Sequence, residues 1–583
     1  MKNPYIHLLS KSWYFAQEKR ASFLLAIGFF IVANSLMLLQ PYFFGQVLNT
    51  LQRWGPDLWH DFVLYLCIYS IIPFFFWIFQ GNGRIIERST AFHIGKNCKE
   101  YIFSIITELP FAWHSDNHSG ETINKVNKAT QALEQFSDDN FMYIQTVVRF
   151  VGSLIGISLI SWYLGVAATL AWVTIIGIIL LFDKRLIPQY RAIFEREHKV
   201  ASLLHDYISN IRTVITLHFE ALAKHELISK IETIFPLKKQ NFILNELKWF
   251  STNMFIDILV FGIIFWYWYH QLQSTGIILA GNLVILYQYL ERFSGSFYSF
   301  AWSYERIVKM NTEVQTIDSI IGEHAKLVKT LNPIIESHWK SIDIKNWNFA
   351  YGTGRDRHTL TNINMELRRW AKIAMIWESG SGKSTMASLI KWLYTPESGS
   401  LTIDQQQHKD LTILSTITTL IPQDPEIFEN TLMYNVTFGI ETAPEHIADA
   451  VRLARFESVI DRLPNWLETN IKEKWVNLSW GEKQRLALAR WLFMARDRDI
   501  IIMDEPTSSV DPTNETIIYK SIFQEYPNKC IISAIHRLHL LPMFDMIYLF
   551  DNGEIVESGS FAELLAQKWR FSVLWEQYRE SSK

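Results

Sequence analysis

Four long stretches of the chain carry almost no charge, and this feature most strongly limits how the chain folds. Residues 21–52 and 62–83 contain no Asp, Glu, Lys or Arg, while residues 140–182 and 249–290 contain one each, Arg149 and Asp257. A helix needs about 20 mostly apolar residues to cross a bilayer. The first two stretches therefore fit one span each, and the two longer ones fit two spans each.

The sequence thus predicts an all-α domain of six membrane helices in a lipid bilayer, with tight turns at residues 163–165 and 273–276. The spans are expected near residues 21–48, 60–82, 140–163, 165–187, 250–271 and 277–300. Buried helices of a large water-soluble protein are the alternative, and runs this long and this often repeated count against it. The first span is too long for a cleavable signal peptide.

Lys and Arg lie mainly on one side of these spans. Residues 2–20, 84–139 and 184–248 are rich in them, while the opposite loops hold only Arg53. Positive charge stays inside, so we expect the N-terminus, both long loops and everything after residue 300 to be cytoplasmic, in a bacterial inner membrane. Apolar residues at helical spacing predict that the long loops extend the helices into the cytoplasm. The net charge of −3 argues against a nucleic-acid partner.

The last 250 or so residues read as a different kind of domain. Strand-like runs alternate with helical ones, which predicts an α/β domain with a mostly parallel sheet. We expect the membrane domain over residues 1–320, a linker over 321–334 and the α/β domain over 335–583. Strands are expected at residues 342–349, 372–376, 500–503, 530–534 and 546–550, and helices at 383–393 and 482–494.

Residues 372–392, KIAMIWESGSGKSTMASLIKW, combine a strand, a glycine-containing loop and a helix. Such a loop cradles phosphates: Gly380 and Gly382 let backbone N–H groups face a polyphosphate, and the helix N-terminus favours an anion. Lys383 is expected to bind the β- and γ-phosphates of ATP, and the Ser384 hydroxyl to bind Mg²⁺. The sequence therefore predicts a P-loop ATPase domain.

A second motif follows the apolar run at residues 500–503. Asp504 and Glu505 end this expected strand. Asp504 is placed to hold Mg²⁺, and Glu505 to orient or polarise the attacking water. Together with the P-loop, the pair predicts nucleotide hydrolysis.

With these motifs the chain resembles the ATP-binding cassette (ABC) transporters, specifically exporter-type half-transporters with six helices. Leu478-Ser479-Trp480-Gly481-Glu482 resembles the family signature LSGGQ, and residues 506–511 resemble the D-loop. The resemblance implies catalytic roles for Glu505, His536 and Gln423, and Mg²⁺ binding by Ser384, Gln423 and Asp504. It implies nucleotide binding by Tyr351, Ser379, Gly380, Ser381, Gly382, Lys383, Ser384, Thr385, Ser479, Gly481, Glu482 and Asp511.

The resemblance also implies a dimer in which each ATP lies between the P-loop of one chain and the signature of the other. The partner is then a second half-transporter, in a homodimer or a heterodimer. Short helices near residues 111–119 and 210–217 resemble the coupling helices that receive movement from the nucleotide domain. The cargo stays open among small molecules, lipids and peptides. For the charged residues within the spans, helix pairing and a cavity role are equally open; these are Arg149, Asp257, Glu291 and Arg292.

Tryptophan stands at several positions where the family usually has glycine. The chain has 25 Gly and 22 Trp, although roughly 7% glycine, or about 41 residues, is usual. Tryptophan supplies neither the positive φ nor the free space of glycine, so three interpretations stay open: an ATP-driven exporter, a catalytically impaired subunit of a heterodimer, and a nucleotide-gated channel or sensor. The affected positions are Trp370, Trp377, Trp466, Trp475 and Trp480, together with Lys472, where glycine is also usual.

Overall fold

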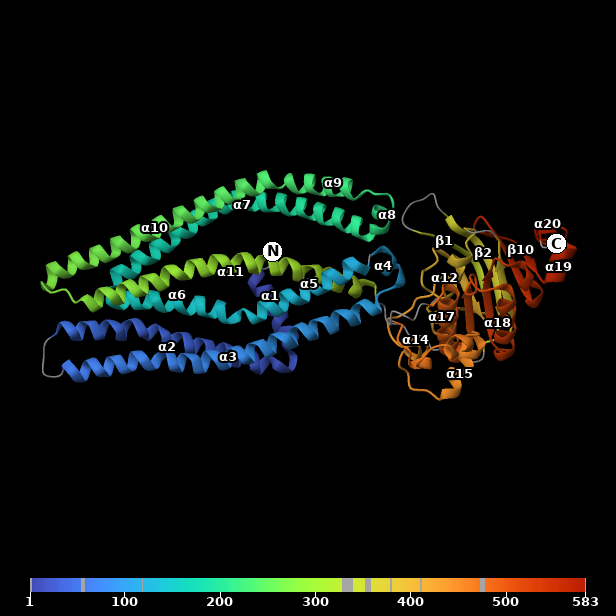
Figure 1. Cartoon of the computed structure of the whole chain (residues 1–583), viewed down its shortest axis with the longest axis horizontal. Coiled ribbons are helices and arrows are strands. Elements are labelled where there is room, and N and C mark those ends of the chain that lie inside the picture. Colours follow the sequence, from blue (N-terminus) through green and yellow to red (C-terminus); the bar gives the residue numbers. More distant parts are fainter. Residues whose placement is uncertain are drawn as a thin grey trace. The chain divides into compact units, whose positions relative to one another are not determined.

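The computed structural model describes residues 3–53, 58–117, 119–327, 339–351, 358–377, 380–408, 412–471 and 478–581. The chain forms two compact units (Figure 1). The helical unit comprises Met1–Thr107 and Gly120–Glu323, and the α/β unit comprises Glu108–Ser119 and His324–Lys583. Three residues singled out in the sequence, Ser379, Lys472 and Trp475, lie outside the described residues, as does half of the expected linker.

The helical unit consists of long helices, as predicted. Within the described residues, five helical segments are long and apolar enough to cross a membrane: Pro4–Gln52, Leu58–Glu108, Asn140–Ile160, Trp162–Ser209 and Glu220–Ser274. The sixth expected span lies in α11, which is 48 residues long but falls short of that apolarity. The helices are α1 (Pro4–Ala16), α2 (Arg20–Gln52), α3 (Leu58–Glu108), α5 (Ser119–Asp138), α6 (Asn140–Ile160), α7 (Trp162–Ser209), α8 (Ile211–Thr216), α9 (Glu220–Glu232), α10 (Phe235–Thr275) and α11 (Ala280–Leu327).

The predicted turn at residues 163–165 is wrong. The chain reverses two residues earlier, at Ser161, whose extended backbone (φ −159°, ψ 126°) separates α6 from α7. Gly165 lies within α7 and serves close packing instead, because a Cβ there would lie 2.1 Å from Ser158 Oγ. The second turn is also shifted: α10 continues to Thr275, and Gly276, with φ 66°, ends it.

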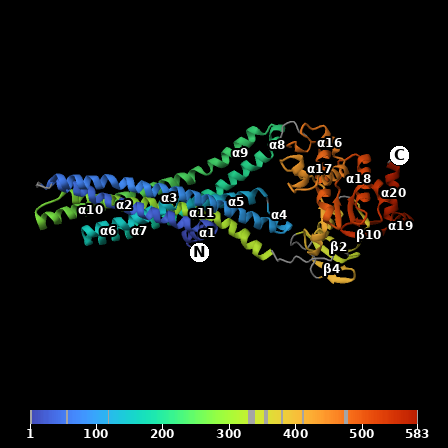
Figure 2. The ribbon, with the colours of Figure 1, turned by 90° about the horizontal axis from the view of Figure 1, so that it is seen from below.

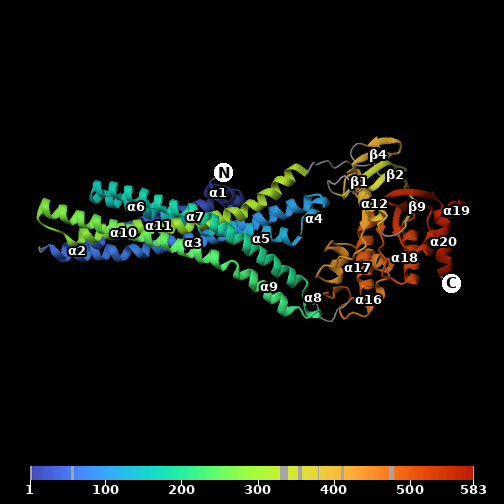
Figure 3. The same ribbon diagram turned by 90° about the horizontal axis from the view of Figure 1, so that it is seen from above.

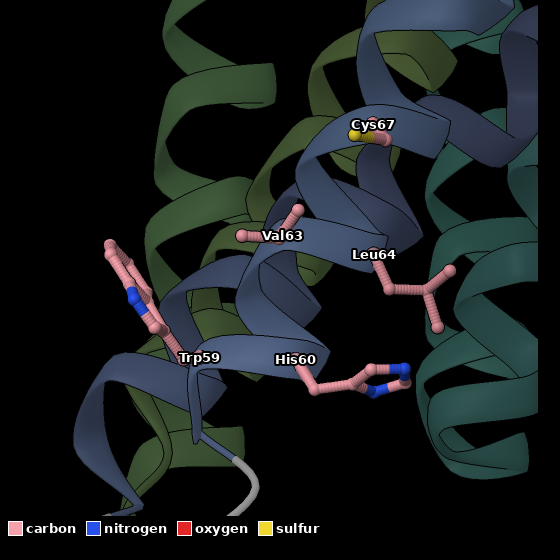
Figure 4. A pocket seen from close by; sticks show the side chains of 5 residues that line it. All are labelled: Trp59, His60, Val63, Leu64 and Cys67. Carbon is pink, nitrogen blue, oxygen red and sulfur yellow. The ribbon is translucent and has the colours of Figure 1, made fainter.

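Large apolar side chains cover the outside of the helical unit. Leu159, Phe261 and Trp77 expose 84%, 78% and 68% of their surface. In water such a surface is unfavourable, but hydrocarbon chains solvate it and every helix satisfies its own backbone. The unit is therefore built for a bilayer. A hollow of about 470 Å³ lies along one end of α3 (Figure 4) and contains no residue of the predicted nucleotide site.

The α/β unit contains a six-stranded sheet in the order β10-β9-β3-β8-β7-β6. All neighbours are parallel except β9 and β10, which confirms the predicted α/β domain. Every strand expected from the sequence lies within one residue of an observed strand. The six strands are β3 (Lys372–Ile376), β6 (Thr418–Ile421), β7 (Ile500–Asp504), β8 (Cys530–Ile535), β9 (Met546–Asp551) and β10 (Glu554–Gly559).

A second sheet of four strands was not predicted. Its order is β2-β1-β4-β5, and every pair in it is antiparallel. Both β1 and β2 carry alternating apolar residues that are buried, whereas β5 has three polar residues and pairs only at the edge. The strands are β1 (Ser341–Ala350), β2 (His358–Arg368), β4 (Ser398–Ile403) and β5 (Gln406–His408).

Both faces of the six-stranded sheet are buried. Successive side chains of β7 point to opposite faces: Ile501 belongs to one apolar cluster and Ile502 to the other. The first cluster lies under α17 and α18, and the second lies under α12 and the antiparallel sheet (Figures 2 and 3). The helices of the unit are α4 (Phe111–Asp116), α12 (Lys383–Ile390), α13 (Ile413–Ile417), α14 (Leu432–Thr437), α15 (Pro444–Leu453), α16 (Glu457–Asp461), α17 (Trp480–Met494), α18 (Pro512–Glu525), α19 (Phe561–Ala566) and α20 (Arg570–Ser581).

Candidate nucleotide site

The predicted phosphate loop joins the end of β3 to the start of α12. Gly380 and Gly382 have φ values of 86° and 108°, a region that side chains with a Cβ avoid. The Lys383 side chain is 4% exposed, and its Nζ donates a hydrogen bond of 2.8 Å to the carbonyl oxygen of Trp377. Burial lowers the pKa of Lys383. The Ser381 hydroxyl is buried without a hydrogen-bond partner among the described atoms, so the loop has a donor to offer an anion.

Ser384 and Asp504 meet beside this loop. The Ser384 hydroxyl donates to Asp504 Oδ1 over 3.1 Å. Burial raises the pKa of Asp504, and the nearby Lys383 and His536 act against that rise. A hydroxyl and a carboxylate next to bound phosphates are the oxygen ligands that Mg²⁺ prefers, so these two residues fit Mg²⁺. The structure brings together two of the three predicted metal ligands.

Glu505 stands at the centre of the predicted catalytic group. Its Oε1 lies 2.5 Å from His536 Nε2, and its Oε2 accepts a hydrogen bond of 3.2 Å from Gln423 Nε2. Glu505 also has a left-handed backbone, with φ 49°, and strain of this kind gathers at functional sites. Burial raises the pKa of Glu505 and lowers that of His536. A carboxylate with a raised pKa is a stronger proton acceptor.

Tyr351 lies next to the phosphate loop. Its hydroxyl donates to Thr385 Oγ1 over 3.3 Å, and its ring is 46% exposed. The ring of Tyr394 meets it edge to face at 5.2 Å. An exposed aromatic face beside a phosphate loop can stack on a nucleotide base.

The signature residues form the start of α17. Ser479 accepts a hydrogen bond from the Glu482 backbone, and Glu482 accepts one of 2.8 Å from the Ser479 backbone, which makes a capping box. Arg462 pairs with Glu482 at 2.6 Å. A Cβ at Gly481 would lie 2.8 Å from the carbonyl oxygen of Ser509, so only glycine fits there.

Asp511 caps α18 by accepting a hydrogen bond of 2.9 Å from the Asn514 backbone. The phosphate loop leads into α12, whereas the signature begins α17 and Asp511 caps α18. A single chain thus presents the two halves of the predicted site on separate elements.

Three residues that the sequence did not single out fix the D-loop to its neighbours. Gln484, on the signature helix, exchanges hydrogen bonds of 2.9 Å with Ser508 Oγ and the Ser509 backbone. Arg537 donates to the Val510 carbonyl over 2.7 Å and pairs with Glu515 at 3.0 Å. The position of Arg537 directly after His536 was a signal, whereas Glu515 reads in the sequence like any helical surface residue.

The tryptophans at expected glycine positions fall into two groups. Trp377 and Trp466 have positive φ values of 139° and 50°, so their backbones adopt conformations that suit glycine. Trp370 and Trp480 lack positive φ, and they expose 60% and 53% of their surface. Trp377 packs its indole against the apolar cluster under α17, and its carbonyl remains in contact with Lys383.

Comparison with known proteins agrees with this geometry. The family model of the ABC transporter transmembrane region matches residues 23–297, and that of the ABC transporter ATP-binding region matches residues 360–508. The chain belongs to the ABC transporters. It therefore binds ATP and couples ATP hydrolysis to transport, as an integral membrane protein with the transmembrane and ATP-binding regions fused.

Several relatives are exporters. The ATM1-type heavy metal exporter of Novosphingobium aromaticivorans is 25% identical over 85% of this chain and 82% of its own length. A multidrug resistance ABC transporter of Lactococcus lactis is 24% identical over 81% of this chain and 80% of its own. The solved structure of a bacterial Atm1-family ABC exporter with ATP bound superposes with a TM-score of 0.83 at 22% identity, covering 96% of this chain and 99% of that one. The fold is that of an exporter half-transporter.

Proposed function

We propose that the chain hydrolyses ATP at two composite sites in a dimer of half-transporters and exports its cargo from the cytoplasm across a bacterial inner membrane. The observation that supports this most strongly is the cluster of Glu505, His536 and Gln423 beside the phosphate loop: His536 Nε2 lies 2.5 Å from the Glu505 carboxylate, and Gln423 donates a hydrogen bond of 3.2 Å to it. A chain that had lost hydrolysis would have no need to keep a strained, hydrogen-bonded carboxylate at this point.

Each residue has a distinct task in this mechanism. The loop N–H groups and Lys383 bind the β- and γ-phosphates. Ser384 and Asp504, with Gln423 as the third ligand, would hold Mg²⁺, and that ion would neutralise phosphate charge. Glu505 accepts the proton of the attacking water, and His536 holds Glu505 in place and contacts the γ-phosphate. Tyr351 stacks on the adenine.

The signature supplies the other half of the site from the second chain. The N-terminus of α17 is a favourable place for a γ-phosphate, and Ser479 and Gly481 lie at it. Gln484, on α17, accepts a hydrogen bond from the Ser509 backbone and so holds the D-loop next to it. Closure then requires the γ-phosphate, and hydrolysis releases it. The two chains are identical in a homodimer, while a heterodimer would pair this chain with a different one.

One observation favours a second function, that of an impaired subunit in a heterodimer. Trp377 adopts φ 139° in the phosphate loop, and a strained loop is a weaker anion site. The test is the ATPase rate of the purified protein in lipid, with Glu505→Gln as the reference. A rate that Glu505→Gln abolishes supports the exporter, and a rate equal to that of the variant supports the impaired subunit. The cargo is a small molecule, a lipid or a peptide.

A further inference from the structure

Three tryptophans of the α/β unit adopt backbone conformations that are typical of glycine. Among the described residues, Trp377, Trp392 and Trp466 have φ values of 139°, 65° and 50°. The next largest φ after Trp377 in a residue other than glycine is 72°. Only Gly382, at 108°, and Gly399, at 117°, come near the Trp377 value. Fourteen described residues other than glycine have positive φ, and Asn and Trp supply three each. Asn tolerates this conformation, whereas a bulky side chain is strained in it, so three tryptophans ask for a common cause.

Several indoles at these positions and at the other expected glycine positions bury little of their surface. Trp466, Trp370 and Trp480 expose 66%, 60% and 53% of their surface. By contrast, Trp339 is 2% exposed and donates a hydrogen bond of 3.0 Å to Asp499. The ring of Trp575 packs edge to face on that of Phe561 at 4.9 Å. The chain therefore has tryptophans that are buried or packed into the fold and others, at expected glycine positions, that are largely exposed. Trp377 lies between these groups, because its indole is partly buried against an apolar cluster.

The amino-acid composition also indicates that tryptophan stands in place of glycine. The chain has 25 glycines against about 41 at the usual frequency, a shortfall of about 16 that amounts to most of its 22 tryptophans. The genetic code offers a direct cause. Tryptophan is encoded by UGG, whereas UGA stands for stop, tryptophan or glycine in different genetic codes. A gene that uses UGA for glycine yields tryptophan at those glycines when its UGA codons are read as tryptophan.

We propose that residues 370, 377, 392, 466 and 480 are encoded by UGA and that the source organism inserts glycine at them. The phosphate loop and the start of α17 are then glycine-bearing in the cell, so the strain at residue 377 and the exposed indole at residue 480 are absent. This inference does not rest on the proposed function, because codons and peptide masses are read without any activity.

The test is to read the codons and to measure peptide masses in the protein purified from its source organism. We expect UGA at the five positions with the residue mass of glycine, and UGG at Trp339 and Trp575 with the mass of tryptophan. UGG codons at residues 377, 392 and 466, or tryptophan masses there, would overturn the proposal.

A second arm uses the full-length recombinant protein and needs no source organism. Trp392→Gly and Trp466→Gly should each raise the melting temperature, because they relieve a strained backbone. Trp339→Gly is the matched control and should lower it, because it removes a buried, hydrogen-bonded indole. A fall in melting temperature for all three variants would show that the fold needs its indoles throughout, and the proposal would fail.

A separate set of contacts, within the α/β unit, links α4 to the nucleotide site. The ring of Phe111 meets that of Tyr394 edge to face at 5.8 Å, and the Ser115 and Tyr394 hydroxyls lie 3.1 Å apart. Tyr394 in turn packs edge to face on Tyr351 at 5.2 Å, and the Tyr351 hydroxyl donates a hydrogen bond to Thr385. One aromatic side chain thus contacts both a short helix at the end of α3 and the expected adenine-stacking residue.

We propose that Tyr394 is a positioning residue that makes the contact of Tyr351 with ATP depend on α4. The proposal rests on the proposed function, since Tyr351 must bind the nucleotide. A displacement of α4 then reaches the ATP through two ring contacts. Tyr394 itself touches no reacting atom, so it acts on ATP binding and leaves the chemical step unchanged.

A double-mutant cycle on the full chain tests this. Phe111→Ala should raise the KM for ATP several-fold with kcat unchanged, and should have no further effect in a Tyr394→Ala background. Additive effects of the two changes, or an equal loss in kcat, would overturn the proposal. Tyr351→Ala separates the two failures: an unchanged KM in that variant refutes the adenine role itself, whereas a raised KM with an additive cycle refutes only the role of Tyr394.

Discussion

The two units bury their apolar residues in opposite ways. In the helical unit many of the largest apolar side chains face outward, as Leu159 does with 84% exposure. In the α/β unit, β7 and β8 are apolar on both faces, and Ile501 is fully buried. Both units have buried apolar clusters, but the first unit also presents many large apolar side chains outward, where a bilayer can cover them. The predicted catalytic group lies in the α/β unit, at the point where the buried strand β7 ends.

The largest effect should come from breaking that core. Ile501→Ala removes a side chain buried between the sheet and α17, and should lower the stability of the α/β unit by about 2–5 kcal/mol. Leu159→Ala, at an outward position of α6, is the matched comparison and should change the melting temperature little. Equal losses for the two variants would remove the contrast between the units.

The next effect concerns the end of β7. Glu505→Gln keeps the shape of the side chain but cannot accept a proton, so ATP hydrolysis should fall by about 10²-fold or more. ATP binding should survive, and the closed dimer should accumulate. Glu554→Gln, on the exposed start of β10, is the control and should hydrolyse ATP normally. Unchanged turnover in Glu505→Gln would mean that Glu505 is only structural.

A smaller effect is expected in the phosphate loop. Trp377→Gly should tighten ATP binding at least several-fold, on the order of 1–2 kcal/mol, because it relieves backbone strain at φ 139°. Trp480→Gly should act on dimer closure instead, because that residue lies at the start of the signature helix. Nucleotide titration of the full-length protein measures both. An unchanged dissociation constant for Trp377→Gly would show that the loop accommodates the indole without strain.

The smallest predicted effect is a displaced pH profile. Glu505 must be ionised to accept a proton, and burial raises its pKa, so kcat should begin to fall at a higher pH than an ordinary glutamate of about 4.3 would cause. At pH values below the pKa of Glu505, this carboxylate is protonated and hydrolysis stops. A profile of kcat against pH checks this, and an acid limb at the ordinary value would contradict a buried Glu505.

The sequence was most informative where an apolar run ends directly in a chemical group. β3 ends before the phosphate loop and β7 ends in Asp504 and Glu505, so periodicity and motif located them together. Turns without such a marker were harder to place: a single extended residue, Ser161, makes the reversal between α6 and α7, while the glycine nearby serves packing. The antiparallel sheet was not predicted although β1 was, because a strand's own pattern does not name its partner, and β5 is too short and polar to show a pattern.

The supports of the site could not be predicted because they depend on tertiary contacts. Gln484 lies 24 residues before the D-loop serine that it bonds, and Glu515 lies on the helix that follows the D-loop. Nothing in their local sequence marks either residue. The tryptophans raised a question in the sequence that only the backbone could sharpen, by showing which of them lie in conformations suited to glycine.

The central claim is that one chain holds two halves of a site that only a second chain completes. The most direct measurement is the ATPase rate of the detergent-solubilised protein, fraction by fraction, with the mass of each fraction determined by light scattering. The account predicts that hydrolysis follows the dimer and that the monomer is inactive. A monomeric fraction that hydrolyses ATP at the full rate would contradict it.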